Sequence, residues 1–138
     1  MIVLDTNVIS EAMKPDSHPN VRAWFNEQAL ETLFLTTITV AEIQFGISSL
    51  SDGRRRDMFA QRFETVSRMF KNRILPFDID AARSHAELAV KAKRSGRGFP
   101  APDGYIAAIA VSCGFSIASR DTAPFLAADI GVINPWEI

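Results

Sequence analysis

The chain has 138 residues, close to the roughly 150 residues of a typical domain, so we expect one domain over residues 1–138. Hydrophobic residues make up 47% and charged residues 22% of the chain, which excludes intrinsic disorder and predicts a globular core. The net charge of −1 excludes a uniformly basic surface, so any nucleic-acid binding must be local.

The cysteine content and hydropathy exclude three further classes of protein. The single cysteine, Cys113, cannot form an intramolecular disulfide or a thiolate zinc site, and its apolar helical stripe predicts a buried, inert thiol. No apolar run approaches the roughly 18 residues of a membrane span, and the first residues lack the pattern of a signal peptide. We therefore expect a cytoplasmic protein.

The first half of the chain is predicted to alternate strands with helices. A short apolar run at 1–4 predicts a strand that ends at Asp5, and Asn7 can cap a helix that stops before Pro15. The next predicted elements are a helix from about residue 20 to 28, a strand at 33–36, a helix from about 39 to 50, and a longer helix from about 52 to 70.

The same alternation continues in the second half. The predicted elements are a strand at 74–77, an alanine-rich helix from 78 or 80 to 96, a helix from 102 to 113, a strand at 116–119, a helical turn at 124–128 and a strand at 132–134. Pro76 indicates a strand end, and Gly114 is a candidate helix C-cap. Strands that alternate with amphipathic helices predict an α/β fold, a three-layer α/β/α sandwich around a mostly parallel sheet.

Four acidic residues lie next to predicted strand ends or helix starts. Asp5 ends the first strand, Asp121 follows the strand at 116–119, and Glu42 and Asp103 lie in the first turns of their helices. Because ligands of parallel sheets gather outside the carboxyl ends of the strands, all four can face one rim. Each also has a structural interpretation: residues 39–42 read as a capping box, Asp103 complements a helix dipole, and the other two can be turn or cap residues.

Carboxylates that share a pocket need either raised pKa values or a bound cation. Oxygen ligands without histidine or thiolate suit Mg²⁺ or Mn²⁺ rather than zinc, and such an ion favours phosphodiester cleavage by an activated water. Glu42 or Asp121 could orient that water. Thr6, Asn7 and Ser119 are nearby polar residues that could hold carboxylates or waters by hydrogen bonds.

Other kinds of catalytic site find little support. His18 lies in a proline-flanked loop and His85 lies among alanines, so both are predicted to be structural. The chain has no nucleophile elbow, phosphate-binding glycine loop or dinucleotide fingerprint. Basic residues that could follow a phosphate backbone, or simply form solvated helix faces, are Arg54, Arg55, Arg56, Lys71, Arg73, Lys91, Lys93, Arg94 and Arg97.

Several segments together resemble the PIN-domain family, and more narrowly the VapC-type toxins of its FitB branch. They are IVLDTNVISE at 2–11, TVAEI at 39–43, DGYIAA at 103–108 and SRDT at 119–122. ILPFD at 74–78 and NPW at 134–136 strengthen the narrower match. The resemblance spans essentially the whole chain in order.

The resemblance implies a PIN-like α/β/α sandwich and a Mg²⁺- or Mn²⁺-dependent ribonuclease, the toxin of a type II toxin–antitoxin pair. It implies a homodimer, with any assembly beyond the dimer left open, and a small DNA-binding antitoxin. The C-terminal segment of such an antitoxin commonly occupies the toxin groove and can push a basic side chain into the acidic site. Asp5 and Asp103 match the main metal-binding positions, and Glu42 and Asp121 match the other two acidic positions. Ser119 stands where a small hydroxyl residue, often threonine, is usual.

Two other functions compete with the ribonuclease. One is a non-catalytic interaction module whose acidic groove docks a basic antitoxin segment. The other is a phosphoacceptor receiver domain, also a small Mg²⁺-binding α/β protein. A receiver needs adjacent acidic residues after its first strand and a lysine after its last, and neither residues 5–6 nor residues 134–135 supply them.

Overall fold

The computed structural model describes the whole chain, from Met1 to Ile138. Its centre is a sheet of five strands in the order β3-β2-β1-β4-β5, and every neighbouring pair is parallel. The strands are β1 (Ile2–Leu4), β2 (Leu33–Thr36), β3 (Ile74–Leu75), β4 (Ser116–Ala118) and β5 (Val132–Ile133). Because parallel neighbours need long crossover connections, helices separate these strands along the chain.

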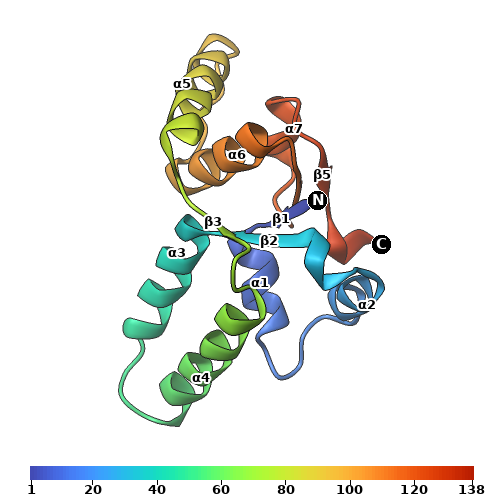
Figure 1. Cartoon of the computed structure of the whole chain (residues 1–138), viewed down its shortest axis with the longest axis vertical. Coiled ribbons are helices and arrows are strands. Elements are labelled where there is room, and N and C mark those ends of the chain that lie inside the picture. The colour runs from blue at the N-terminus through green and yellow to red at the C-terminus, as the bar shows by residue number, and fades with distance from the viewer.

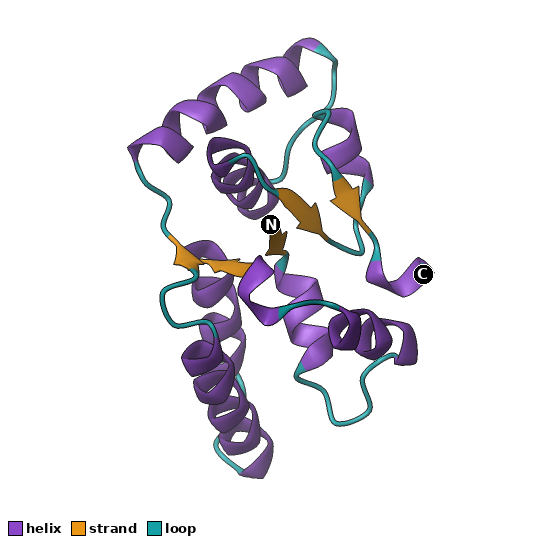
Figure 2. Cartoon of the chain, turned by 45° about the vertical axis from the view of Figure 1, so that its right-hand side comes forward, coloured by secondary structure: helices purple, strands orange, loops and turns teal.

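The helices cover both faces of the sheet (Figures 1 and 2). On one side lie α1 (Thr6–Ala12), α2 (Pro19–Glu27), α3 (Thr37–Ser48) and α4 (Arg54–Met69), and on the other lie α5 (Ile79–Arg94), α6 (Ala101–Cys113) and α7 (Ala123–Ala127). Short 3-10 turns add Leu30–Thr32 and Pro135–Glu137. This arrangement confirms the predicted α/β/α sandwich. No helix combines the length and hydrophobicity that a membrane crossing requires.

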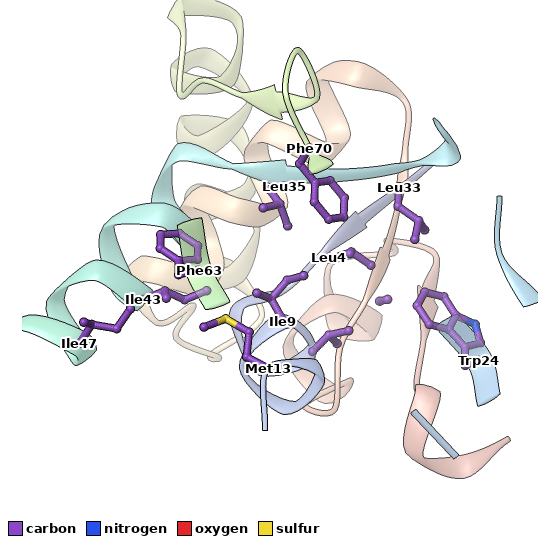
Figure 3. Packing of buried hydrophobic residues seen from close by; sticks show 12 residues of the cluster. Leu4, Ile9, Met13, Trp24, Leu33, Leu35, Ile43, Ile47, Phe63 and Phe70 are labelled. Carbon is purple, nitrogen blue, oxygen red and sulfur yellow. The ribbon is translucent and has the colours of Figure 1, made fainter. Parts of the chain in front are cut away.

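Each face of the sheet has its own hydrophobic core because side chains alternate along a strand. In β1, Val3 packs toward α6 and α7, whereas Leu4 packs toward the helices of the other face. Figure 3 shows the core on the face covered by α1–α4, in which Leu4 and Leu35 of the sheet meet Ile9 of α1 and Phe63 of α4. The predicted apolar stripe of α4 therefore covers the sheet.

Some local predictions were wrong. Asp5, not Asn7, is the N-cap of α1, and α3 begins at Thr37 rather than 39 because Thr36 caps it. The third strand stops at Leu75, since Pro76 has no N–H to continue the ladder. Cys113 is exposed rather than buried, because it is the last residue of α6 before the left-handed Gly114.

Candidate active site

The carboxyl ends of β1, β2 and β4 meet at one rim of the sheet. Leu4 is in register with Ala118, so the residues that follow them, Asp5 and Ser119, lie at the same level. The Asp5 amide N–H donates to the Ala118 carbonyl at 2.9 Å and continues the ladder by one step. The strand order also reverses its direction at β1, and this is the point where ligands of open parallel sheets bind.

Asp5 is buried, and hydrogen bonds fix both of its carboxylate oxygens. Oδ1 accepts from the backbone N–H of Thr6 at 2.8 Å. Oδ2 accepts from the Ser119 hydroxyl at 2.7 Å and from the Asn7 amide at 3.3 Å. Ser119 Oγ also accepts the backbone N–H of Asp121 at 3.1 Å, so one buried hydroxyl links the Asp5 side chain to the loop that carries Asp121.

A chain of threonines positions Glu42. The Thr6 hydroxyl donates to Glu42 Oε1 at 2.7 Å and lies 3.0 Å from the Thr39 hydroxyl. Thr39 is fully buried and donates its backbone N–H to the Thr36 hydroxyl at 3.1 Å. The end of β2, the start of α3 and the start of α1 are thus joined, and Glu42 points toward the rim from the second turn of α3.

The remaining two carboxylates reach the same rim from α6 and from the loop after β4. Asp103 is half-buried in the first turn of α6, and Asp121 is exposed three residues after β4. Burial, and then the negative charges of Asp5, Asp121 and Glu42, raise the pKa of Asp103 to about 6. Burial, with further contributions from Glu42 and Asp121, also raises the pKa of Asp5, although its hydrogen bonds from Ser119 and Thr6 oppose the shift. The other three predicted carboxylates therefore all lie near enough to disfavour the charge of Asp103.

The donor chemistry at this rim fits a hard divalent cation. Its charged groups are carboxylates, with no histidine or thiolate among them, and their repulsion is the kind that a bound cation relieves. No three Asp, Glu, His or Cys side chains stand close enough together to ligate one ion as they are placed. Mg²⁺ typically uses only one or two protein carboxylates and completes its shell with water and phosphate oxygens, so such an ion does not need three protein ligands.

The structure also decides between the alternative interpretations of the single residues. The capping box at 39–42 is wrong, because Glu42 lies beyond the first turn and bonds to Thr6 instead of the helix start. Asp103 does lie in the first turn of its helix, and Asp5 is both a cap and a member of the cluster. Sequence reasoning missed the supporting role of Thr36, for which the run TTIT at 36–39 is the only signal.

The two histidines have structural contacts. His18 Nδ1 accepts the backbone N–H of Asn20 and caps α2. His85 lies 4.7 Å from the Tyr105 ring and 6.3 Å from the Phe77 ring, centroid to centroid. Neither supplies a hydrogen bond to the four carboxylates.

Two cavities border the acidic cluster, which consists of Asp5, Glu42, Asp103 and Asp121. One, of about 210 Å³, runs between α1, α3 and α4, and it has Thr6 and Glu42 at one end and Met13, Ile47 and Phe59 among its apolar residues. The other, of about 320 Å³, has Asp121 at its rim and lies between α5, α7 and the loop at 95–100. The acidic cluster thus opens to surface clefts on two sides.

The fold and site together define an α/β/α protein with an acidic centre at the carboxyl ends of a parallel sheet. The PIN domain family model matches residues 2–130, and the chain belongs to that family. It is 52% identical over 138 residues to the VapC ribonuclease Y4jK of Sinorhizobium fredii, and 43% identical over 137 residues to the toxin FitB of Neisseria gonorrhoeae; each match covers 99% of both chains. A solved structure of FitAB bound to the IR36 DNA fragment matches with a TM-score of 0.94 and 41% identity, over 100% of this chain and 97% of the other.

Proposed function

We propose that this chain is a metal-dependent endoribonuclease, the toxin of a type II toxin–antitoxin pair, and that it acts in the cytoplasm as a single domain over residues 1–138. The observation that carries this proposal is the convergence of carboxylates at one rim of the sheet: Asp5 accepts hydrogen bonds from Thr6 and Ser119, and the Thr6 hydroxyl also donates to Glu42. Asp103 and Asp121 act on the same charges. A bound cation relieves the repulsion among carboxylates that share a site. The likeness to relatives that are named a VapC ribonuclease and a toxin supports RNA as the substrate.

Asp5 and Asp103 are the proposed ligands of Mg²⁺ or Mn²⁺. When bound, the ion acidifies a water and neutralises charge on phosphate oxygens. Ser119 favours the ionised form of Asp5 and fixes its orientation, because its hydroxyl donates to Oδ2 at 2.7 Å. Asn7 holds both Asp5 and Ser119 in place.

The other two carboxylates are the proposed proton acceptors. Glu42 keeps Oε1 engaged with Thr6, which leaves Oε2 as its second acceptor for the attacking water. Asp121 is exposed and can accept a hydrogen bond from a water on the opposite side. Either group orients the water and takes its proton as the water oxygen bonds to phosphorus. The bond from phosphorus to the leaving ribose oxygen breaks, and that oxygen takes a proton from solvent.

The proposed partner is a small DNA-binding antitoxin. Its C-terminal segment is proposed to lie in the cleft between α1, α3 and α4, where apolar side chains can anchor on Met13, Ile47 and Phe59 and a basic side chain can reach Glu42. The likeness to FitAB on DNA supports this partner.

We also propose a homodimer, because large apolar side chains such as Phe45 and Ile79 are 74% and 66% exposed. Light scattering of the purified chain tests this state, and a monomer at all concentrations contradicts it.

RNA cleavage by the wild type and by Asp5→Asn, each with Mg²⁺, Mn²⁺ or EDTA, tests the activity. We expect the wild type to cleave only with a metal, and Asp5→Asn to lose at least about 100-fold, because a proposed metal ligand and its charge are removed. Asp57→Asn is the matched control, since it alters an exposed aspartate in the first turn of α4 that does not contribute to the pKa shifts of Asp5 or Asp103. Equal cleavage by wild type and Asp5→Asn contradicts the catalytic assignment.

The non-catalytic interaction module predicts a different outcome. A chain that binds the antitoxin but cleaves no RNA with either metal, after the antitoxin has been removed, supports that function. The acidic cluster would then serve only to bind a basic segment.

A further inference from the structure

The cavity next to Asp121 has a chemical character opposite to that of the acidic cluster. It is about 320 Å³ in volume and lies between the second half of α5, the loop at 95–100 and α7. Its volume lies within the range of small-molecule sites, which is roughly 300–1,000 Å³. Asp121 belongs both to the lining of this cavity and to the group of carboxylates, so the cavity adjoins the acidic cluster.

Two features of its lining suit different parts of one ligand. Phe99 and Pro124 give it an apolar wall, and Phe99 is fixed by an edge-on contact with Phe125 at 6.0 Å between ring centroids. Arg97 lies at the same cavity, is exposed, and makes no salt bridge or side-chain hydrogen bond within the chain. Lys91, the other cation of the lining, is already paired with Asp129 at 2.7 Å. Arg97 is therefore the cation available to an anionic ligand.

The ligand that suits this lining is a nucleotide next to a reacting phosphate. The cavity offers it an aromatic wall, an unpaired guanidinium and an adjoining acidic centre. The base needs an apolar surface for stacking, its own phosphate needs a cation, and the next phosphate along the strand must reach the carboxylates. A base inside a duplex cannot enter a cavity in this way, because it is stacked and paired.

We propose that this cavity holds one unstacked nucleotide of single-stranded RNA, with its base against Phe99 and a phosphate at Arg97. The nucleotide is the direct neighbour of the one whose phosphate lies at the acidic cluster. This inference rests on the RNA substrate proposed above. It assigns the cavity next to Asp121 to the substrate, and the cleft next to Glu42 remains the proposed position of the antitoxin.

Two pairs of variants test the cavity, each with its own control. Arg97→Ala removes the free cation, and Arg94→Ala removes another exposed arginine that does not line this cavity. Ala127→Phe fills the cavity from an exposed position of α7. Ala60→Phe instead adds the same bulk at an exposed position of α4, in a surface hollow that shares no residue with this cavity.

Binding is measured by fluorescence anisotropy of a labelled single-stranded oligoribonucleotide in EDTA, which prevents metal-dependent cleavage. We expect Arg97→Ala and Ala127→Phe each to weaken binding about tenfold, while both controls bind like the wild type. For Arg97→Ala, the slope of log K against log salt should also become shallower by about 0.7, the value for one single-strand phosphate.

Oligonucleotides that lack one base at a time give a second readout. The wild type should lose affinity when one particular base is absent, and Ala127→Phe should no longer distinguish that oligonucleotide from the intact one. Equal binding by all four variants overturns the proposal, and so does an Ala60→Phe loss as large as that of Ala127→Phe. An Ala127→Phe chain that binds RNA normally but no longer copurifies with the antitoxin assigns the cavity to the protein partner instead, and this also overturns it.

The same measurements separate this inference from the proposed activity. A wild type that shows the expected binding pattern but cleaves no RNA with Mg²⁺ or Mn²⁺ contradicts the ribonuclease and supports the nucleotide cavity. A wild type that cleaves RNA while all four variants bind alike supports the ribonuclease and contradicts the cavity.

Discussion

Replacing Asp103 by asparagine should stabilise the metal-free protein at neutral pH. The pKa of this carboxyl rises from 3.8 to about 6 in the folded chain, because burial and three neighbouring carboxylates disfavour its charge. Between about pH 4 and pH 6 the folded state holds a proton that the unfolded state has released. The free energy of unfolding therefore falls as pH rises through this window, and it stays lower above it. Asparagine cannot ionise and avoids that loss.

The size of the effect follows from the shift. About two pKa units correspond to about 3 kcal/mol at most, at 1.36 kcal/mol per unit. Asp103 is only half-buried, so solvent screens part of this interaction and we expect about 1.5 kcal/mol. For a domain of this length, that energy corresponds to an increase in melting temperature of about 5 °C.

Calorimetric melting curves in EDTA from pH 4 to pH 8 measure this difference. Asp80→Asn is the matched control, because it removes an exposed aspartate from the first turn of α5 as the test variant does from α6. The control should cost about 0.3–1 kcal/mol through the helix dipole alone. If Asp103→Asn melts at or below the wild-type temperature at pH 7.5, the inferred repulsion among the four carboxylates is wrong.

Three further predictions concern the metal, the support of Asp5 and the core. Mn²⁺ at about 100 times its Kd should raise the stability of the wild type by about 2.7 kcal/mol in thermal melts, EDTA should reverse this, and no shift at millimolar Mn²⁺ contradicts a metal site. Ser119→Ala should weaken Mn²⁺ binding about 10- to 100-fold by calorimetry because Asp5 loses its shortest hydrogen bond, and Ser119→Thr should retain most of it. Leu35→Ala should cost about 2–5 kcal/mol in urea unfolding, since this β2 side chain is fully buried between the sheet and the helices α1, α3 and α4, and a cost below about 1 kcal/mol refutes that packing.

Much of the fold could be predicted from short-range patterns. The strand at 33–36 was predicted with the bounds that the structure has, because its apolar run is flanked by polar residues. Pro102 and Gly114 marked the ends of α6, since a proline fits the first turn of a helix and Gly114 has a φ of 72°. These signals act within a few residues, so a sequence displays them.

The details of the site depend on contacts between distant segments. Thr6 and Glu42 are 36 residues apart, and only the packing of α1 beside α3 brings the hydroxyl within 2.7 Å of the carboxylate. The local pattern at 39–42 therefore favoured a capping box that does not form. Cys113 was misplaced for a similar reason, because an apolar periodicity does not show where the last turn of a helix leaves the core.

The position of a bound ion tests the central claim most directly. Anomalous diffraction from crystals of the wild-type chain grown with Mn²⁺ locates the metal without any assay of activity. We predict one strong manganese peak within ligand distance of the carboxylates of Asp5 and Asp103. A well-ordered crystal with no peak at this rim, or with manganese only at other surface carboxylates, contradicts the account.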